Sequence, residues 1–448
     1  MTNRDDFIIA ASVPQKGYHT SGALDEANAM LAADPTIAAE GARGNIYLAA
    51  VLGDDAAVRD LLTLDLENAT RKGGPFNWDA LTYLCFSRFF RLDDTRSDAF
   101  VRTATALLDA GANPNAGFFD SQYGPTPTFE SVLYGAAGIA HHADVTRLLL
   151  ARGADPNDDE TPYHTPETYD NGAMEALVES GKLTADSMTS LLVRKADWHD
   201  TEGMRYLLEH GADPNSLSRW KVTPLQQAVR RDNDMAKIAL MLDHGGDLAI
   251  TKDIHFPNAF RIGARRGRGD ILAEAARRGV IAEFTGLDAL VAACAMNNGD
   301  AARAMIAARP DIVPVLQREG GTLLSEFAGN RNVDGVRLLL DLGVPVTVRY
   351  MSGDGYFEIA PMSLAIHVAA WKAAHEVVAL LIERGSPVND ADGRGRTPLM
   401  LAVRACVDSH WTSRRAPDSV QALIGAGASR TGITVPTGYN EIDVLLGD

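Results

Sequence analysis

Aromatic, histidine and arginine side chains concentrate in a few short stretches of this chain, and residues of these types could bind another molecule or react with it. Trp, Tyr and Arg are the side chains that most often dominate binding at protein interfaces. A histidine or a carboxylate within hydrogen-bond reach of a substrate can act as a general acid or base. The candidate binding residues are Trp78, Tyr123, Tyr163, His164, Trp198, His199, Arg219, Trp220, Tyr350, His410 and Trp411.

The stretch DPNDDETPYHTPETYD, residues 155–170, is rich in ionisable side chains. Its carboxylates and its histidine could surround a cation. Their spacing, however, matches neither an EF-hand calcium loop nor a helical pair of zinc-binding histidines. We therefore expect a solvent-exposed loop, stiffened by Pro162 and Pro166, that holds no metal and is suited to contacting a ligand.

Two functions fit these residues. The first is the binding of a protein or peptide without any chemistry. The alternative is an enzyme that uses acid–base or metal-assisted chemistry on a peptide or small substrate, with Tyr163, His164, His199 and Asp200 as the first candidates. The sequence lacks the motifs of phosphate-binding loops, serine hydrolases, zinc peptidases and paired cysteines. We therefore favour binding and expect no cofactor.

The elements that must position these residues are marked by a recurring glycine. It stands in LLDAGANPN at residues 107–115, in LLLARGADPN at 148–157 and in YLLEHGADPN at 206–215. After a helix that ends in Leu-Leu, this position needs a left-handed backbone, which glycine adopts without strain. The proline that follows cannot continue a helix. Glycines at this position, with a period of about 33 residues, are Gly111, Gly153, Gly181, Gly211, Gly245, Gly279, Gly343, Gly385 and Gly427.

Other residues mark where a unit begins. Thr223-Pro224-Leu225 and Thr397-Pro398-Leu399 precede runs of small and apolar residues at helical spacing. Threonine can cap the first turn of a helix, and proline is tolerated there because its missing N–H would have no partner. Each unit is therefore predicted as a short helix, a turn, a second helix, the glycine and an extended loop.

These motifs resemble the ankyrin repeat, whose signature is T-P-L-H-x-A followed by a helix ending LL-x-x-GA-D-x-N. The resemblance implies an all-α solenoid of helix-turn-helix units joined by extended β-turn loops. We expect about 11–12 units over residues 23–430, several of them degenerate, with residues 1–22 and 431–448 as terminal caps. The resemblance also implies that a protein or peptide is bound in a concave groove.

Departures from the repeat are expected at the binding surface, because insertions in repeat proteins emerge as loops on one face. Residues 76–98 carry many aromatic side chains, which we expect to pack between helices. Trp78 is the exception, because it stands at a turn, and we expect it to contact the partner.

Neighbouring turns could also share a ligand. Equivalent positions of adjacent repeats lie about 10 Å apart, so we expect Tyr123, Tyr163 and Trp220 to line one stretch of groove. An alternative is that Trp198 and Trp220 cap the ends of helices.

Two longer insertions lie toward the C-terminus, at residues 348–361 and 407–419. We expect the first insertion to expose Tyr350, Tyr356 and Phe357. The second places His410 and Trp411 beside two arginines in a basic, aromatic cluster. Both insertions could extend the groove or pack on the C-terminal cap.

The net charge of −17 argues against a general nucleic-acid binder, because contacts to phosphates need clustered Lys and Arg. Residues 251–280 are a local exception, with seven basic and three acidic side chains. We expect these basic groups to pair with acidic neighbours. The alternative is a docking patch for an acidic partner or a phosphate.

The sequence shows no export signal and no apolar stretch long enough to span a membrane. Cys85, Cys294 and Cys406 lie far apart, so we expect reduced core residues. We therefore expect a cytoplasmic monomer, of bacterial origin by its Ala, Asp and Arg usage. Its negative charge would favour basic protein or peptide partners.

Overall fold

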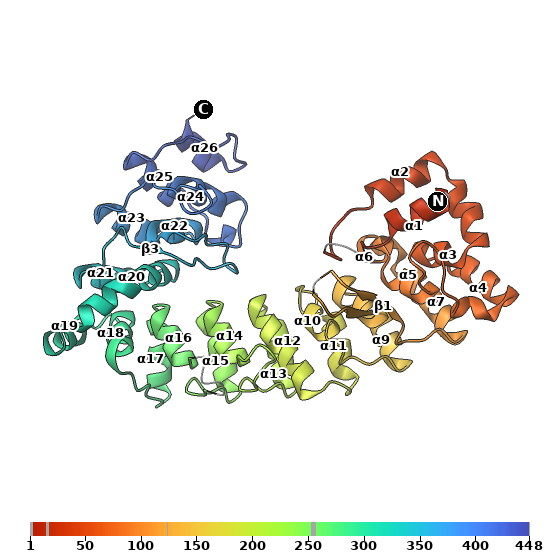
Figure 1. The fold of residues 1–448 in the computed structure, drawn as a ribbon, viewed down its shortest axis with the longest axis horizontal. Helices are drawn as coiled ribbons and strands as arrows, with labels where there is room; N and C mark the ends of the chain where they lie inside the picture. The colour runs from red at the N-terminus through yellow and green to blue at the C-terminus, as the bar shows by residue number, and fades with distance from the viewer. Residues whose placement is uncertain (1–2, 15–17, 123, 252–256, 448) are drawn as a thin grey trace. The chain divides into compact units, whose positions relative to one another are not determined.

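Pairs of helices follow one another along the chain in the computed structural model, which describes residues 3–14, 18–122, 124–251 and 257–447 (Figure 1). The predicted all-α repeat solenoid is confirmed. The helices form two compact units, Met1–Asp247 and Leu248–Asp448. Two short antiparallel hairpins accompany them: β1 (Gly117–Asp120) with β2 (Thr128–Ser131), and β3 (Arg349–Tyr350) with β4 (Ser363–Leu364).

In the N-terminal unit, the first helices of successive repeats pack in one row and the second helices in another (Figure 1). The first helices are α3 (Ile46–Leu52), α5 (Ala80–Cys85), α8 (Val132–Tyr134), α10 (Thr161–His164), α12 (Ala185–Asp197) and α14 (Pro224–Arg230). The second helices are α4 (Asp55–Leu64), α7 (Ser97–Asp109), α9 (Ala143–Ala151), α11 (Gly172–Glu179), α13 (Thr201–Glu209) and α15 (Met235–Asp243). Three further helices are α1 (Asn3–Ala11), α2 (Asp25–Ala33) and α6 (Arg88–Leu92).

The C-terminal unit has the same alternation. Its first helices are α16 (Ala259–Arg265), α18 (Gly286–Ala295), α20 (Ile312–Gly329), α22 (Ala365–Trp371) and α24 (Pro398–Val407). Its second helices are α17 (Gly269–Arg277), α19 (Gly299–Ala308), α21 (Val333–Asp341), α23 (His375–Glu383) and α25 (Asp418–Gly425), followed by α26 (Asn440–Leu446).

The recurring glycines take the predicted backbone conformation. All nine have positive φ angles, between 65° and 98°. At Gly111 nothing lies within 4 Å of the position that a Cβ would occupy, so the backbone angle, and not crowding, requires glycine. Where the period would place another glycine, Arg309 is found instead, and its helix ends in an extended residue with φ −137°.

The asparagine that follows the glycine in each clear repeat ties neighbouring repeats together. Asn157 donates from Nδ2 to the Lys182 carbonyl at 3.0 Å, and its Oδ1 accepts the Thr184 amide at 2.7 Å. Asn389 makes the equivalent pair of bonds in the C-terminal unit, to the Gly427 carbonyl and the Ser429 amide. The Asn of the motif therefore satisfies backbone groups of the next repeat.

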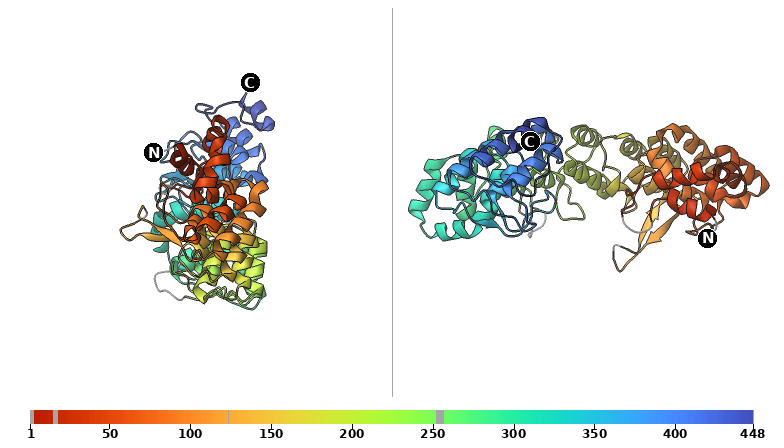
Figure 2. Two further views of the ribbon diagram at one scale, coloured as in Figure 1. Left: turned by 90° about the vertical axis from the view of Figure 1, so that its right-hand side faces the viewer. Right: turned by 90° about the horizontal axis from the view of Figure 1, so that it is seen from above.

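The terminal segments contact the repeats beside them. Helix α1 packs on α3, and the Val13 amide donates to the Phe86 carbonyl at 2.8 Å. Helix α26 packs on α25. The hairpin β1–β2 extends away from the helices of its unit, as Figure 2 shows.

Candidate binding site

A tight turn before α14 presents two of the predicted binding residues. The Lys221 amide donates to the Ser218 carbonyl at 2.9 Å, and the Ser218 amide donates to the Val222 carbonyl at 3.0 Å. Lys221 completes the turn in a left-handed conformation, with φ 64°. Arg219 and Trp220 therefore lie at the tip of the loop.

Tyr163, at the end of α10, meets this loop tip. The rings of Tyr163 and Trp220 are 5.5 Å apart, and the Arg219 guanidinium lies 4.7 Å from the Trp220 ring. The Arg194 guanidinium covers the Tyr163 ring at 4.2 Å. Cations over aromatic rings are worth about 0.5–2 kcal/mol each, depending on exposure. Tyr163 and Trp220 thus come together as predicted, whereas Tyr123 lies outside the described residues.

These side chains border a pocket of about 290 Å³ formed by three consecutive first helices, α10, α12 and α14. We call it the Tyr163–Trp220 pocket. Aromatic and valine side chains form part of its wall, and three guanidinium groups and one carboxylate form the rest. The residues that line it are Tyr163, Val193, Arg194, Asp197, Trp220, Val222, Gln227, Arg230 and Arg231.

Asp197 is the polar centre of the pocket. Its Oδ1 accepts Gln227 Nε2 at 2.6 Å and Arg231 Nε at 2.7 Å, while its Oδ2 accepts Arg194 Nη1 at 2.6 Å. The amide oxygen of Gln227 is buried and has no hydrogen-bond partner. A buried acceptor without a donor is unfavourable, so the pocket has an unused hydrogen-bonding group.

His164 is held between two carboxylates beside the pocket. Its Nε2 lies 3.1 Å from Glu160, and its Nδ1 lies 3.1 Å from Glu167. Burial alone would lower the pKa of His164, but the two ion pairs outweigh it and raise this pKa to about 9. Glu167 also pairs with Arg194. This imidazole is therefore charged at neutral pH and fixed in place.

The predicted solvent-exposed loop at residues 155–170 is therefore wrong in part. Thr161 and Pro162 are buried, and the segment forms α10. Just before this helix, Asp158 accepts the Thr161 amide at 2.6 Å and the Thr161 hydroxyl at 2.9 Å. The proline in the first turn could have indicated this helix start in the sequence.

The remaining candidates near this region directly follow α12 and do not line the pocket. Trp198 and His199 occupy the turn between α12 and α13, where the Trp198 ring contacts Tyr169. Asp200 caps α13 and accepts the buried Lys195 ammonium at 2.8 Å. Of the four residues of the enzyme alternative, only Tyr163 lines the pocket.

Trp78 is not at the surface, contrary to expectation. Its ring is 3% exposed and stacks on Phe118 of β1 at 4.4 Å. The ring of Phe86 is also nearby, at 5.8 Å. The hairpin β1–β2 brings Phe118 over this turn, so Trp78 belongs to the packing of the N-terminal unit. The other rings predicted to pack in residues 76–98 are buried as expected.

In the C-terminal unit, Tyr350, Phe357 and Trp411 are also buried, at 6%, 5% and 9% exposure, so the expected exposure of Tyr350 and Phe357 is wrong. The Tyr350 hydroxyl donates to Glu326 at 3.1 Å. The Lys372 ammonium lies 4.0 Å from the Phe357 ring and 5.1 Å from the Trp411 ring. His410 remains exposed.

A polar cluster that the sequence did not reveal lies where residues 18–22 meet the β1–β2 hairpin. His19 Nδ1 is 3.1 Å from the Tyr134 hydroxyl, and its Nε2 is 3.5 Å from Asp120. Burial, together with the charges of Glu160 and Asp120, raises the pKa of Glu130 to about 8. No spacing pattern links these residues, because three separate segments contribute them.

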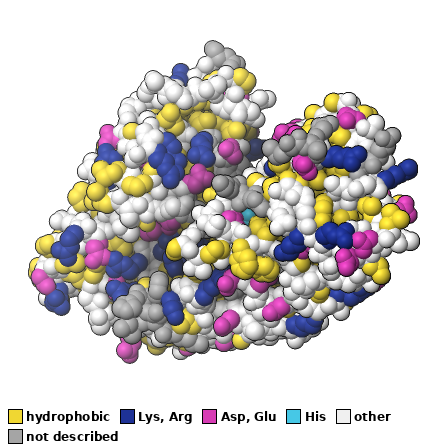
Figure 3. Space-filling view, turned by 45° about the vertical axis from the view of Figure 1, so that its right-hand side comes forward, with side chains coloured by type: hydrophobic (Ala, Val, Ile, Leu, Met, Phe, Trp, Pro, Cys, Tyr) yellow, Lys and Arg dark blue, Asp and Glu magenta, His cyan; other side chains and the backbone are white. Residues whose placement is uncertain are grey.

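The basic side chains of residues 251–280 pair with acids, as the first interpretation expected. Arg265 binds Asp288, Arg266 binds Glu326, and Arg268 binds Asp270. Glu274 pairs with two further arginines of this segment. Lys252 lies outside the described residues. On the face drawn in Figure 3, basic and acidic side chains are interspersed.

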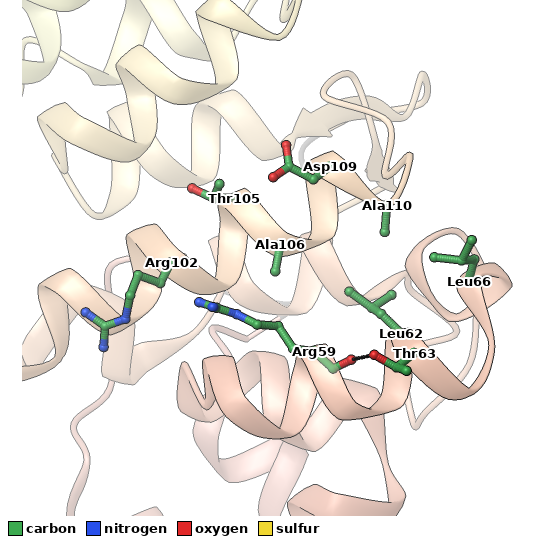
Figure 4. A pocket seen from close by; sticks show the side chains of 9 residues that line it. All are labelled: Arg59, Leu62, Thr63, Leu66, Arg102, Thr105, Ala106, Asp109 and Ala110. Atoms are coloured by element: carbon green, nitrogen blue, oxygen red, sulfur yellow. Dashed lines mark hydrogen bonds between the residues drawn. The ribbon is translucent and has the colours of Figure 1, made fainter.

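A larger pocket, of about 550 Å³, lies between the second helices α4 and α7 (Figure 4). Arg59 and Leu62 line it from α4, and Arg102 and Ala106 from α7. Both arginines are largely exposed and pair with Asp55. Every polar group at this pocket can therefore be hydrated, in contrast to Gln227.

Three further observations bear on the alternatives. Within the described ranges, no group of three or more His, Cys, Asp or Glu side chains is arranged to hold a metal ion. Across the same residues, no helix is both long and apolar enough to cross a bilayer. All three cysteines are buried and unpaired, and burial raises the pKa of the Cys294 thiol to about 12.

Comparisons with known proteins complete the description. No protein-family model matches the sequence. No curated protein matches it. The solved structures that resemble it include the crystal structure of the human ASB11 ankyrin repeat domain, at 18% sequence identity and a TM-score of 0.24, with 67% of this chain and 99% of that chain covered.

Proposed function

We propose that this chain is a protein- or peptide-binding repeat protein and that the Tyr163–Trp220 pocket is its principal contact site. The observation that carries the proposal is the half-exposed cluster of Tyr163, Trp220 and Arg219 beside a pocket with an unused buried acceptor. Aromatic and arginine side chains next to desolvated pockets are typical of interface hot spots.

The arrangement also favours binding over chemistry. Asp197, in the wall of the pocket, already accepts three hydrogen bonds. His164, beside the pocket, is held between Glu160 and Glu167. Its raised pKa keeps its proton bound at neutral pH. His199 and Asp200 follow α12 and do not line the pocket, and Asp200 is paired with Lys195. A substrate in the pocket would therefore meet fixed charges and rings, which is the chemistry of recognition. The ankyrin-like motifs support the same function.

A selection experiment tests this proposal. A displayed library of random 12-residue peptides would be selected on the full chain, and the peptides recovered would be titrated by fluorescence polarisation. We expect Trp220→Ala to raise their Kd at least about tenfold, which is the loss of one aromatic anchor.

The matched control is Tyr169→Ala. Tyr169 is also an exposed aromatic residue, but it contacts Trp198 and does not line the pocket. We expect this variant to bind like the wild type. Selection of no peptide, or of peptides that bind the Trp220 variant equally well, would refute the proposal.

A further inference from the structure

We propose that the Tyr163–Trp220 pocket receives an acidic side chain, a glutamate or an aspartate, from the bound peptide segment. This inference depends on the proposed function and specifies the partner of the same site. It reverses, for this pocket, the preference for basic partners that the net charge of −17 suggests.

The charged groups that line the pocket favour an acidic ligand. Arg194, Arg230 and Arg231 contribute three guanidinium groups, against the single carboxylate of Asp197. Glu167, outside the lining, pairs with Arg194. Even with this second carboxylate counted, guanidinium groups remain in excess. A carboxylate that entered the pocket would therefore find a favourable potential, and Arg groups bind carboxylates with directed hydrogen bonds.

The hydrogen bonds that Asp197 already accepts also disfavour a basic ligand. Its two oxygens already accept three hydrogen bonds, from Gln227, Arg231 and Arg194. Asp197 thus orients the two guanidinium groups and the amide, and it leaves little room for a basic ligand to pair with it. A cationic side chain would instead meet the arginines and be repelled.

The buried amide oxygen of Gln227 favours a peptide over a simple anion. Gln227 is 5% exposed, and its Oε1 has no partner while its Nε2 is bound to Asp197. A donor is needed for this oxygen. The main-chain N–H of a peptide supplies one beside its own side chain, which a simple anion does not.

The size of the pocket and the side chains of its walls fit a single acidic side chain. A volume of about 290 Å³ lies at the lower limit of small-molecule sites and suits one side chain with its adjoining main chain. Tyr163, Trp220 and Val222 can cover the methylene groups of a glutamate. A phosphorylated side chain brings up to two negative charges close to Asp197, so the carboxylate is the better fit.

The test uses the full chain and the peptides that need Trp220 for binding. In each peptide, every glutamate is replaced in turn by glutamine and every aspartate by asparagine. We expect one replacement to weaken binding at least about tenfold, because it removes a charge-assisted hydrogen bond. The same peptide should lose affinity as the sodium chloride concentration rises about tenfold, from roughly 50 to roughly 500 mM, because salt screens the attraction between the charges.

A protein variant localises the effect. Arg230→Gln should weaken the acidic peptide several-fold, and the neutral peptide should then bind this variant no more weakly than the acidic one. Arg205→Gln, on the second helix α13, is the matched control and should have no effect. If Arg230→Gln unfolds the chain, as judged by circular dichroism, the peptide replacements on the wild type still decide the matter.

The outcomes separate the two proposals. Peptides that depend on Trp220 but tolerate loss of every acidic residue would overturn this inference and leave the binding function intact. So would a phosphoserine peptide that binds more than about tenfold tighter than its glutamate counterpart, because the pocket would then be a phosphate site. Absence of any peptide that depends on Trp220 would overturn both.

Discussion

The two units of this chain carry similar groups of aromatic and cationic side chains, but only one group is open to solvent. In the N-terminal unit, Tyr163 and Trp220 are half-buried beside arginines and border a pocket. In the C-terminal unit, Phe357 and Trp411 cover the buried ammonium of Lys372. The same residue types therefore form a partly exposed surface in one place and a packed core in the other.

The lengths of the loops explain the difference. Trp220 comes from a tight turn that leaves no additional chain to fold over it. Phe357 lies in the long connection between β3 and β4, and Trp411 lies in the extended link after α24. These two insertions fold onto α22, where the Trp371 indole donates to the Phe357 carbonyl at 2.6 Å. An insertion in a repeat protein can thus cover a surface as readily as it extends one.

The largest expected effect is a loss of stability when Phe357, in the buried aromatic group of the C-terminal unit, is replaced. Replacing Phe357 by Ala should lower the free energy of unfolding by about 3–5 kcal/mol, as for other buried aromatic residues. The phenyl ring also covers Lys372, whose charge would lose its aromatic contact. Urea unfolding followed by circular dichroism measures the loss. A change below about 1 kcal/mol would show that this ring is not a packing element.

The next largest effect is the pH dependence of stability that Glu130 and His164 of the N-terminal unit should cause. The pKa of Glu130 is about 8 in the folded chain, against an ordinary value of 4.5, and that of His164 is about 9, against 6.5. Between pH 6.5 and 8 the folded state therefore holds more protons than the unfolded state. Stability should fall as pH rises through this range, by about 2 kcal/mol from Glu130 alone.

The variant Glu130→Gln isolates this contribution, because glutamine stays neutral at every pH. We expect its urea midpoint to fall less than that of the wild type between pH 6.5 and 8. Glu202→Gln, an exposed substitution on α13, serves as the control and should follow the wild type. Parallel pH profiles for Glu130→Gln and the wild type would contradict the raised pKa.

A smaller effect compares the two units directly. Asn157→Ala and Asn389→Ala each remove the side chain that joins one repeat to the next, and each should cost about 1–2 kcal/mol. Asn157 should cost more, because its Oδ1 also accepts the Ser187 hydroxyl at 2.9 Å. Urea unfolding of both variants shows which substitution lowers the free energy of unfolding more. The reverse order would show that these bonds do not determine the coupling between repeats.

The sequence predicted the repeat well where one residue type is required. The left-handed residue after most of the second helices is a glycine, and its spacing revealed the solenoid. A second left-handed position, in the turn after many of the first helices, was missed because no single residue type marks it. Its occupants other than glycine are His141, His199, Asp232, Asn297, Arg331 and Ala373, all with φ between 52° and 60°.

The site was predicted less completely, for a related reason. Tyr163 and Trp220 were expected to meet because they occupy nearby turns of a regular array. The burial of Trp78, Tyr350 and Trp411 depends instead on how a hairpin or an insertion folds back over them. The spacing of residues along the chain does not predict the direction in which such a segment folds. Gln227 and Asp197 were missed because each is an ordinary polar residue on a helix. Only the packing of three helices brings them together.

The smallest expected effect on stability belongs to Trp220→Ala, and it completes the comparison with Phe357. The Trp220 ring is half-buried and contacts Tyr163 and the Arg219 guanidinium, so its removal should cost about 1 kcal/mol. The same variant should lose most of its affinity for a selected peptide. Urea unfolding and peptide titration on one preparation measure both quantities. A loss of about 3 kcal/mol or more, as expected for Phe357, would make Trp220 a packing residue as well. The distinction between an open and a covered aromatic group would then disappear.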